Sequence, residues 1–111
     1  MKNEMNDNLD EFDKYVMSYD LNEKMIEFKY KHSYRVMHES DEISYTINLD
    51  EDDNYLACLI GLLHDYGRFP QWKEYKTFND RKSVDHAELG AKILFDEGDI
   101  KKYRLATEDY D

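Results

Sequence analysis

A histidine and an aspartate stand side by side at the end of the most apolar run in this 111-residue sequence. His64 and Asp65 follow the apolar residues 59–63 and precede a tyrosine, a glycine and Arg68. A core helix has no packing reason to end on an imidazole and a carboxylate. A neutral nitrogen donor beside a hard oxygen donor can instead hold one divalent ion. The pair therefore predicts a metal site.

Two further histidines, in the segments that flank this pair, are candidates to complete the site. His32 falls on the apolar face of the pattern through residues 23–47, and His86 lies beyond a polar connection. A lone histidine on an apolar face is more often a core group satisfied by hydrogen bonds, but the His-Asp pair downstream favours a ligand. Each segment is expected to be helical, so the donors are expected to converge in a helical bundle.

Three stretches carry a resemblance to a known family. They read YKHSYRV at residues 30–36, LLHDYGR at 62–68 and DHAE at 85–88. Together they resemble the HD-domain metal-dependent phosphohydrolases, from the second expected helix to the end of the chain. A His-Asp pair alone is weak evidence. The upstream histidine, the apolar approach, the glycine and basic residue after the pair, and the third histidine make the combination specific.

The resemblance implies hydrolysis of a phosphate ester by metal-activated water. It assigns His32, His64 and Asp65 to the metal, with Asp65 also orienting the water. His86 resembles an additional histidine that contacts a second metal or a phosphate. Arg68 stands where a lysine is common in the family, and its flat guanidinium suits a phosphate in the catalytic site. The mixed donors suit Mn, Fe, Co, Ni, Zn or Mg, and the sequence does not select one.

Further basic residues are candidates to bind the substrate. Arg35 lies one turn after His32 and is expected to point into the same region, although a surface salt bridge is nearly as good an interpretation. Lys73 and Lys82 lie in residues 68–82, where basic and aromatic side chains alternate. That stretch is expected to be a long loop at the rim of the substrate site. An ordinary surface loop is the alternative.

The family pattern ends in a further aspartate on a later helix. Asp109 and Asp111 lie near the end of this chain, but their setting does not match that aspartate. The sequence thus resembles the N-terminal part of an HD domain. We expect weak or absent activity and an uncovered apolar face, with self-association as a homo-oligomer or marginal stability as its result. A catalytically impaired metal- or nucleotide-binding regulatory module is the alternative function, and a purely structural helical domain is the least favoured.

Composition limits the partners. A net charge of −11 argues against non-specific binding to nucleic acid or to an anionic membrane, because both need a basic surface. The family resemblance implies a small phosphorylated substrate, with nucleotides included. Cys58 is the single cysteine and is expected to be a buried thiol. No signal peptide or membrane-spanning stretch is visible, so the expected location is cytoplasmic.

The expected fold class is all-α, because no segment shows sustained two-residue alternation. The resemblance further implies an HD-like helical bundle that is incomplete at its C-terminus. Residues 1–9 are expected to be a flexible N-terminus, and residues 10–111 the helical domain. About four helices are expected, near residues 9–19, 23–47, 52–66 and 83–97.

Several single residues are expected to shape these helices. Asn22, Asp50 and Ser83 are candidate caps at helix starts. Gly61 is expected to let another helix approach closely. Gly67 is expected to end the third helix in the left-handed conformation.

Overall fold

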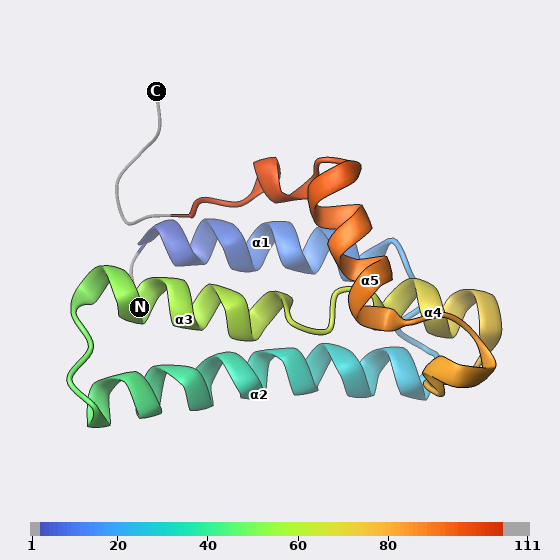
Figure 1. Ribbon diagram of the computed structural model, residues 1–111, viewed down its shortest axis with the longest axis horizontal. Coiled ribbons are helices and arrows are strands. Elements are labelled where there is room, and N and C mark those ends of the chain that lie inside the picture. The colour runs from blue at the N-terminus through green and yellow to red at the C-terminus, as the bar shows by residue number, and fades with distance from the viewer. Residues whose placement is uncertain (1–2, 106–111) are drawn as a thin grey trace.

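The computed structural model describes residues 3–105, and within that range all regular structure is helical. The helices are α1 (Asn3–Met17), α2 (Lys24–Thr46), α3 (Glu51–Leu63), α4 (Arg68–Tyr75) and α5 (His86–Ala91), with short segments η1 (Asp80–Lys82), η2 (Lys92–Asp96) and η3 (Asp99–Lys102). Figure 1 shows α3 between α1 and α2, with α2 running antiparallel to both. The all-α prediction is confirmed.

Helix α1 begins earlier than the sequence predicts. It starts at Asn3, so the described part of the segment expected to be flexible is helical. Asn8 is buried, and its Nδ2 donates to Tyr55 Oη at 2.8 Å and to the Arg104 carbonyl at 2.9 Å. Its Oδ1 accepts from the Arg104 backbone N–H at 2.7 Å. These partners lie far away in the sequence, and so a local pattern does not reveal them.

Helices α2 and α3 pack along most of their length. A Cβ atom at Gly61 would lie 2.8 Å from Ser40 Oγ and 3.2 Å from Met37 Cα, so the missing side chain is what allows this approach. Ser33, Met37 and Ser44 are buried on α2, and their spacing of four and seven residues places them on one helical face. The predicted close approach at Gly61 is confirmed.

Aromatic rings fix the end of α3 against α1. The rings of Tyr15 and Tyr66 stack with centroids 3.8 Å apart, and Tyr15 Oη donates to the Tyr66 carbonyl at 2.8 Å. Phe69 is fully buried and meets Phe12 edge-on at 6.0 Å. Such pairs combine a large apolar area with a defined geometry. They anchor the turn that carries the His-Asp pair.

That turn differs from the prediction. Helix α3 ends at Leu63, so Asp65 lies in a turn after the helix and not in its last turn. Gly67 has φ −76°, which is not left-handed. A Cβ atom there would overlap the His86 carbonyl oxygen and lie 2.7 Å from the Gly90 nitrogen. Gly67 is therefore needed because α5 approaches the turn closely, which brings the start of α5 to the His-Asp pair.

The stretch expected to be a long loop is helical in its first half. Helix α4 occupies Arg68–Tyr75, with Pro70 in its first turn, where a missing N–H is tolerated. The residue after the helix, Lys76, is its C-cap and has φ 54°. Residues 76–85, which include η1, connect α4 to α5.

One of the three predicted caps is confirmed. Asp50 Oδ1 accepts from the Asp53 backbone N–H at 2.8 Å at the start of α3. Helix α5 is capped by Asp85 and not by Ser83. Asn22 does not cap α2, whose N-cap is the residue after it and makes no side-chain capping bond.

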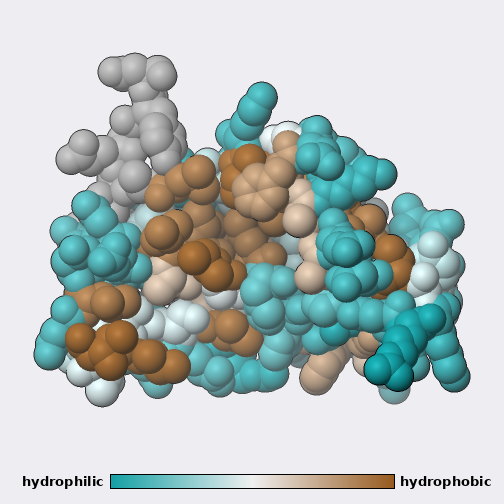
Figure 2. Space-filling view, in the orientation of Figure 1, coloured by the Kyte–Doolittle hydropathy of each residue, from teal (hydrophilic) through white to brown (hydrophobic). Residues whose placement is uncertain are grey.

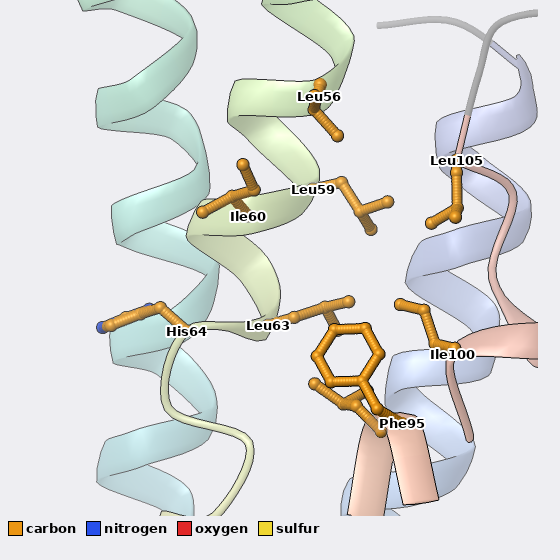
Figure 3. A pocket seen from close by; sticks show the side chains of 9 residues that line it. Leu56, Leu59, Ile60, Leu63, His64, Phe95, Ile100 and Leu105 are labelled. Atoms are coloured by element: carbon orange, nitrogen blue, oxygen red, sulfur yellow. The ribbon is translucent and has the colours of Figure 1, made fainter. Parts of the chain in front are cut away.

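An apolar groove of about 340 Å³ opens beside α3. It is lined by Leu56, Leu59, Ile60, Leu63, His64, Leu94, Phe95, Ile100 and Leu105. Ile60 and Phe95 are 60% and 65% exposed, and Figure 2 shows apolar side chains gathered over this face. In Figure 3 the nitrogens of His64 point away from the groove. The groove lies on the opposite side of His64 from its ring nitrogens.

Within residues 3–105, every helix is too short or too polar to cross a membrane.

Candidate metal centre

Two imidazoles and a carboxylate converge where α2 passes the end of α3. His32 Nε2 and His64 Nε2 lie 3.5 and 3.3 Å from the same Asp65 atom, Oδ2. One donor atom from each of the three side chains lies within 4.8 Å of the other two. Donors this close can share one divalent ion. The structure thus brings together the three residues that the sequence proposes as ligands.

Asp65 is nearly enclosed by positively charged or protonatable groups. Lys29 Nζ lies 3.0 Å from Oδ2, while His86 Nε2 and Arg68 Nε lie 3.5 and 3.9 Å from Oδ1. Burial by itself would raise the pKa of the Asp65 carboxyl. Hydrogen bonds from His64 and Lys29 outweigh it and hold the pKa well below its usual range. Asp65 is therefore an anion at neutral pH.

In the cluster formed by His32, His64 and Asp65, the hydrogen bond made by Nδ1 of each histidine determines whether its Nε2 carries a proton or offers a lone pair to a metal ion. His64 Nδ1 lies 2.7 Å from the Gly61 carbonyl and donates to it. The hydrogen bond with Asp65 raises the pKa of His64, so the protonated ring also donates from Nε2, and loss of that proton leaves the Nε2 lone pair toward Asp65. Arg35 Nη2 lies 2.8 Å from His32 Nδ1. Because arginine only donates, Nδ1 accepts, and neutral His32 carries its proton on Nε2. His64 is thus oriented for a metal, whereas His32 must lose its Arg35 contact first.

His86 also reaches the cluster, and Asp80 holds it there. Asp80 Oδ2 lies 2.9 Å from His86 Nδ1, while Oδ1 accepts from Gln71 Nε2 at 2.9 Å and from Arg68 Nη1 at 3.0 Å. Hydrogen bonds from His86 and Gln71 lower the pKa of Asp80 to about 2. Asp80, Asp85 and His86 form a second group whose donor atoms could hold a metal ion.

Sequence reasoning missed Lys29 and Asp80. Lys29 lies three residues before His32 on α2, so helical spacing was a usable sign that both face the same way. Asp80 lies in a polar connection without periodicity. Its partners come from α4 and α5, so only the tertiary structure reveals its position.

Arg68 has a structural role that the sequence does not predict. Its Nη1 donates to Gln71 Oε1 at 2.9 Å, to the Phe78 carbonyl at 2.8 Å and to Asp80 Oδ1 at 3.0 Å. These bonds tie the start of α4 to the connection that follows it. The buried Nε has no hydrogen-bond partner among the described residues and faces Asp65. Arg68 thus helps to hold the fold, and its contact with phosphate stays a prediction.

The other predicted substrate cations are not equally placed. Arg35 contacts His32, as expected from its position one turn later. Lys73 lies over the ring of Tyr19, with its Nζ 5.7 Å from the ring centroid. Lys82 is exposed in η1. Among residues 3–105, Arg35 is the one of these three that contacts a residue of the cluster, namely His32.

The HD domain family model matches residues 30–109, which include His32, the His64-Asp65 pair and His86. This chain belongs to the HD-domain family. Searches among curated proteins and among solved structures each found no significant match. Asp109 and Asp111, near the end of the sequence, lie outside the described residues of this HD domain.

Proposed function

We propose that this HD domain hydrolyses phosphate esters with a divalent ion held by His32, His64 and Asp65. The convergence of two imidazole nitrogens and one carboxylate oxygen within 4.8 Å supports this most strongly. An ion bound there would lower the pKa of water and neutralise charge on phosphoryl oxygens. The proposed substrate is a small phosphorylated molecule, with nucleotides included.

The donor set fits a transition metal. Two imidazoles and a carboxylate suit Mn, Fe, Co, Ni or Zn, whereas Mg prefers a shell of oxygen ligands. Asp65 supplies the negative charge, because its depressed pKa keeps it ionised. In its neutral form His64 is held by the Gly61 carbonyl in the tautomer that offers Nε2.

The remaining side chains are arranged to receive an anion. His86 Nε2 points to the Asp65 side of the cluster while Asp80 holds its Nδ1. The buried Arg68 Nε faces the same oxygen of Asp65. Arg35 adds an exposed guanidinium next to His32. We infer that a phosphate group binds among these donors, with His86 as a direct contact.

A regulatory module that binds a metal or nucleotide without turnover is the second candidate. One observation favours it: among residues 3–105, the group formed with His32 and His64 includes a single carboxylate, Asp65. Lys29 and Arg68 also lie against that carboxylate. Fewer anionic ligands and nearby cations both weaken the binding of a divalent ion.

Metal content and turnover, measured together, test these proposals. Protein purified without chelator should contain a transition metal, and it should hydrolyse p-nitrophenyl phosphate, its bis-ester or a nucleotide with added Mn²⁺. His64→Ala and Asp65→Asn should lose both properties. His38→Ala is the matched control, because His38 is exposed on α2. Metal binding without turnover of any substrate favours the regulatory module, and full metal occupancy in His64→Ala refutes the ligand assignment.

A further inference from the structure

Lys29 reaches the same carboxylate oxygen that faces both histidines. Its Nζ lies 3.0 Å from Asp65 Oδ2, closer than either imidazole nitrogen. The Lys29 and Asp65 side chains are only 14% and 7% exposed. This ion pair is therefore largely shielded from water. Opposite charges attract each other more strongly in such a site than at the surface.

Two aromatic rings flank the Lys29 ammonium. Nζ lies 5.4 Å from the ring centroid of Phe78 and 5.8 Å from that of Phe28. Cations are attracted to ring faces at such distances. The Phe78 backbone is itself held, because its carbonyl accepts from Arg68. The ammonium is thus confined beside Oδ2 by contacts from two segments of the chain.

A lysine ammonium and a divalent ion require the same oxygen. We propose that Lys29 is an internal competitor of the metal, which neutralises Asp65 when no ion is bound and gives up Oδ2 when one binds. This inference rests on the metal site of the proposed function. A buried carboxylate without a partner is strongly unfavourable. Lys29 therefore stabilises the ion-free fold, and the same charge raises the metal concentration needed to load the site.

The affinity for the metal alone tests this role. Lys29→Met removes the charge and nearly keeps the length of the side chain, whereas Lys29→Arg keeps the charge. Lys31→Met is the matched control, because Lys31 lies on the same helix, is 71% exposed and pairs with Glu27. The dissociation constants for Mn²⁺ and Zn²⁺ are measured by competition with a chromogenic chelator. We expect Lys29→Met to bind about tenfold more tightly or better, with Lys29→Arg and Lys31→Met within about twofold of the unsubstituted protein.

Thermal unfolding gives an independent readout. Without metal, Lys29→Met should melt at a lower temperature than the unsubstituted protein, and Mn²⁺ should raise its Tm by more. If Lys29→Met does not fold without metal, Lys29→Gln keeps a neutral donor and should also bind the ions more tightly. Equal or weaker affinity in the uncharged variants, with metal still bound by the unsubstituted protein, overturns the role of Lys29 and leaves the metal site standing. Absence of binding in every variant overturns both.

Discussion

The Asp80 carboxylate pairs with the His86 ring, and its Oδ2 lies 2.9 Å from Nδ1. The other ring nitrogen, Nε2, lies 3.5 Å from Asp65 Oδ1. When a histidine donates its Nδ1 proton to a carboxylate, Nε2 is left with its lone pair and the ring is fixed in orientation. Asp80 is therefore a positioning residue, which sets how His86 faces the cluster without touching the cluster itself.

Asp80→Asn should disturb His86 first. We expect the nitrogen NMR shifts of the His86 ring to move toward a mixture of tautomers, because the amide no longer provides an anionic acceptor. Activity against the phosphate esters should fall by roughly 10- to 100-fold, as is typical when the partner of a site histidine is lost. Asp96→Asn, at an exposed position of η2, is the control. Unchanged His86 shifts in Asp80→Asn would contradict the positioning role.

Arg68→Ala should destabilise the fold. The substitution removes three hydrogen bonds from Nη1, and the buried Gln71 Oε1 loses the Arg68 donor. Unsatisfied buried groups cost about 1–3 kcal/mol each, so urea unfolding should show a loss of that order. Arg81→Ala, at an exposed position of η1, should change the unfolding free energy little. If Arg68→Ala leaves the stability unchanged and weakens phosphate binding, Arg68 binds the substrate and does not hold the fold.

The central part of the site was predictable from the sequence because its information is local. His32 lies on a periodic apolar face, and the His64-Asp65 pair ends an apolar run, so motif and helical spacing agree on the three candidate ligands that the structure brings together. The supporting residues were not predictable in the same way. Asp80 lies in a stretch without periodicity, and its partners come from elements before and after it. Its position depends on tertiary packing, which no local pattern records.

The same distinction explains the errors in the fold. The sequence predicts a loop where helix α4 forms, because basic and aromatic side chains alternate along that stretch. Its place is determined by buried Phe69 and Gln71, which contact α1 and the connection before α5. The early start of α1 depends likewise on distant partners of Asn8. Amphipathic spacing predicts that helices form, and long-range contacts decide where they begin and end.

The Cys58 thiol should be unreactive in the folded protein. It is buried on α3, and burial, with Asp41 nearby, raises its pKa to about 11. Because the thiolate is the reactive form, labelling with a thiol reagent at pH 8 should be slow until the protein unfolds in urea. The pKa is higher in the folded state, so this thiol's contribution to stability is complete below the unfolded pKa of about 8.5. That contribution is lost as the pH rises toward about 11. Fast labelling under native conditions would contradict the burial of Cys58.

Gly67→Ala should be among the most damaging single substitutions. The added Cβ would overlap the His86 carbonyl oxygen and lie 2.7 Å from the Gly90 nitrogen, and both neighbours are backbone atoms that cannot turn aside. Overpacking of this kind costs about 1–3 kcal/mol or more. It should also displace the turn that carries Asp65, a proposed metal ligand, relative to the start of α5. Both the Tm and the affinity for Mn²⁺ should therefore fall.

Gly98→Ala is the matched control for this prediction. Gly98 has φ 86°, and apart from Gly98 itself and its two chain neighbours no atom of residues 3–105 lies within 4 Å of a Cβ built there. Alanine should therefore cost only the strain of the left-handed conformation, about 1 kcal/mol. Urea unfolding and Mn²⁺ titration of the two variants separate the effects. Gly98→Ala should lose some stability and keep its metal affinity, whereas Gly67→Ala should lose both, because only Gly67 lies where α5 meets the His-Asp turn. Equal losses of metal affinity in the two variants would show that this close approach does not position the site.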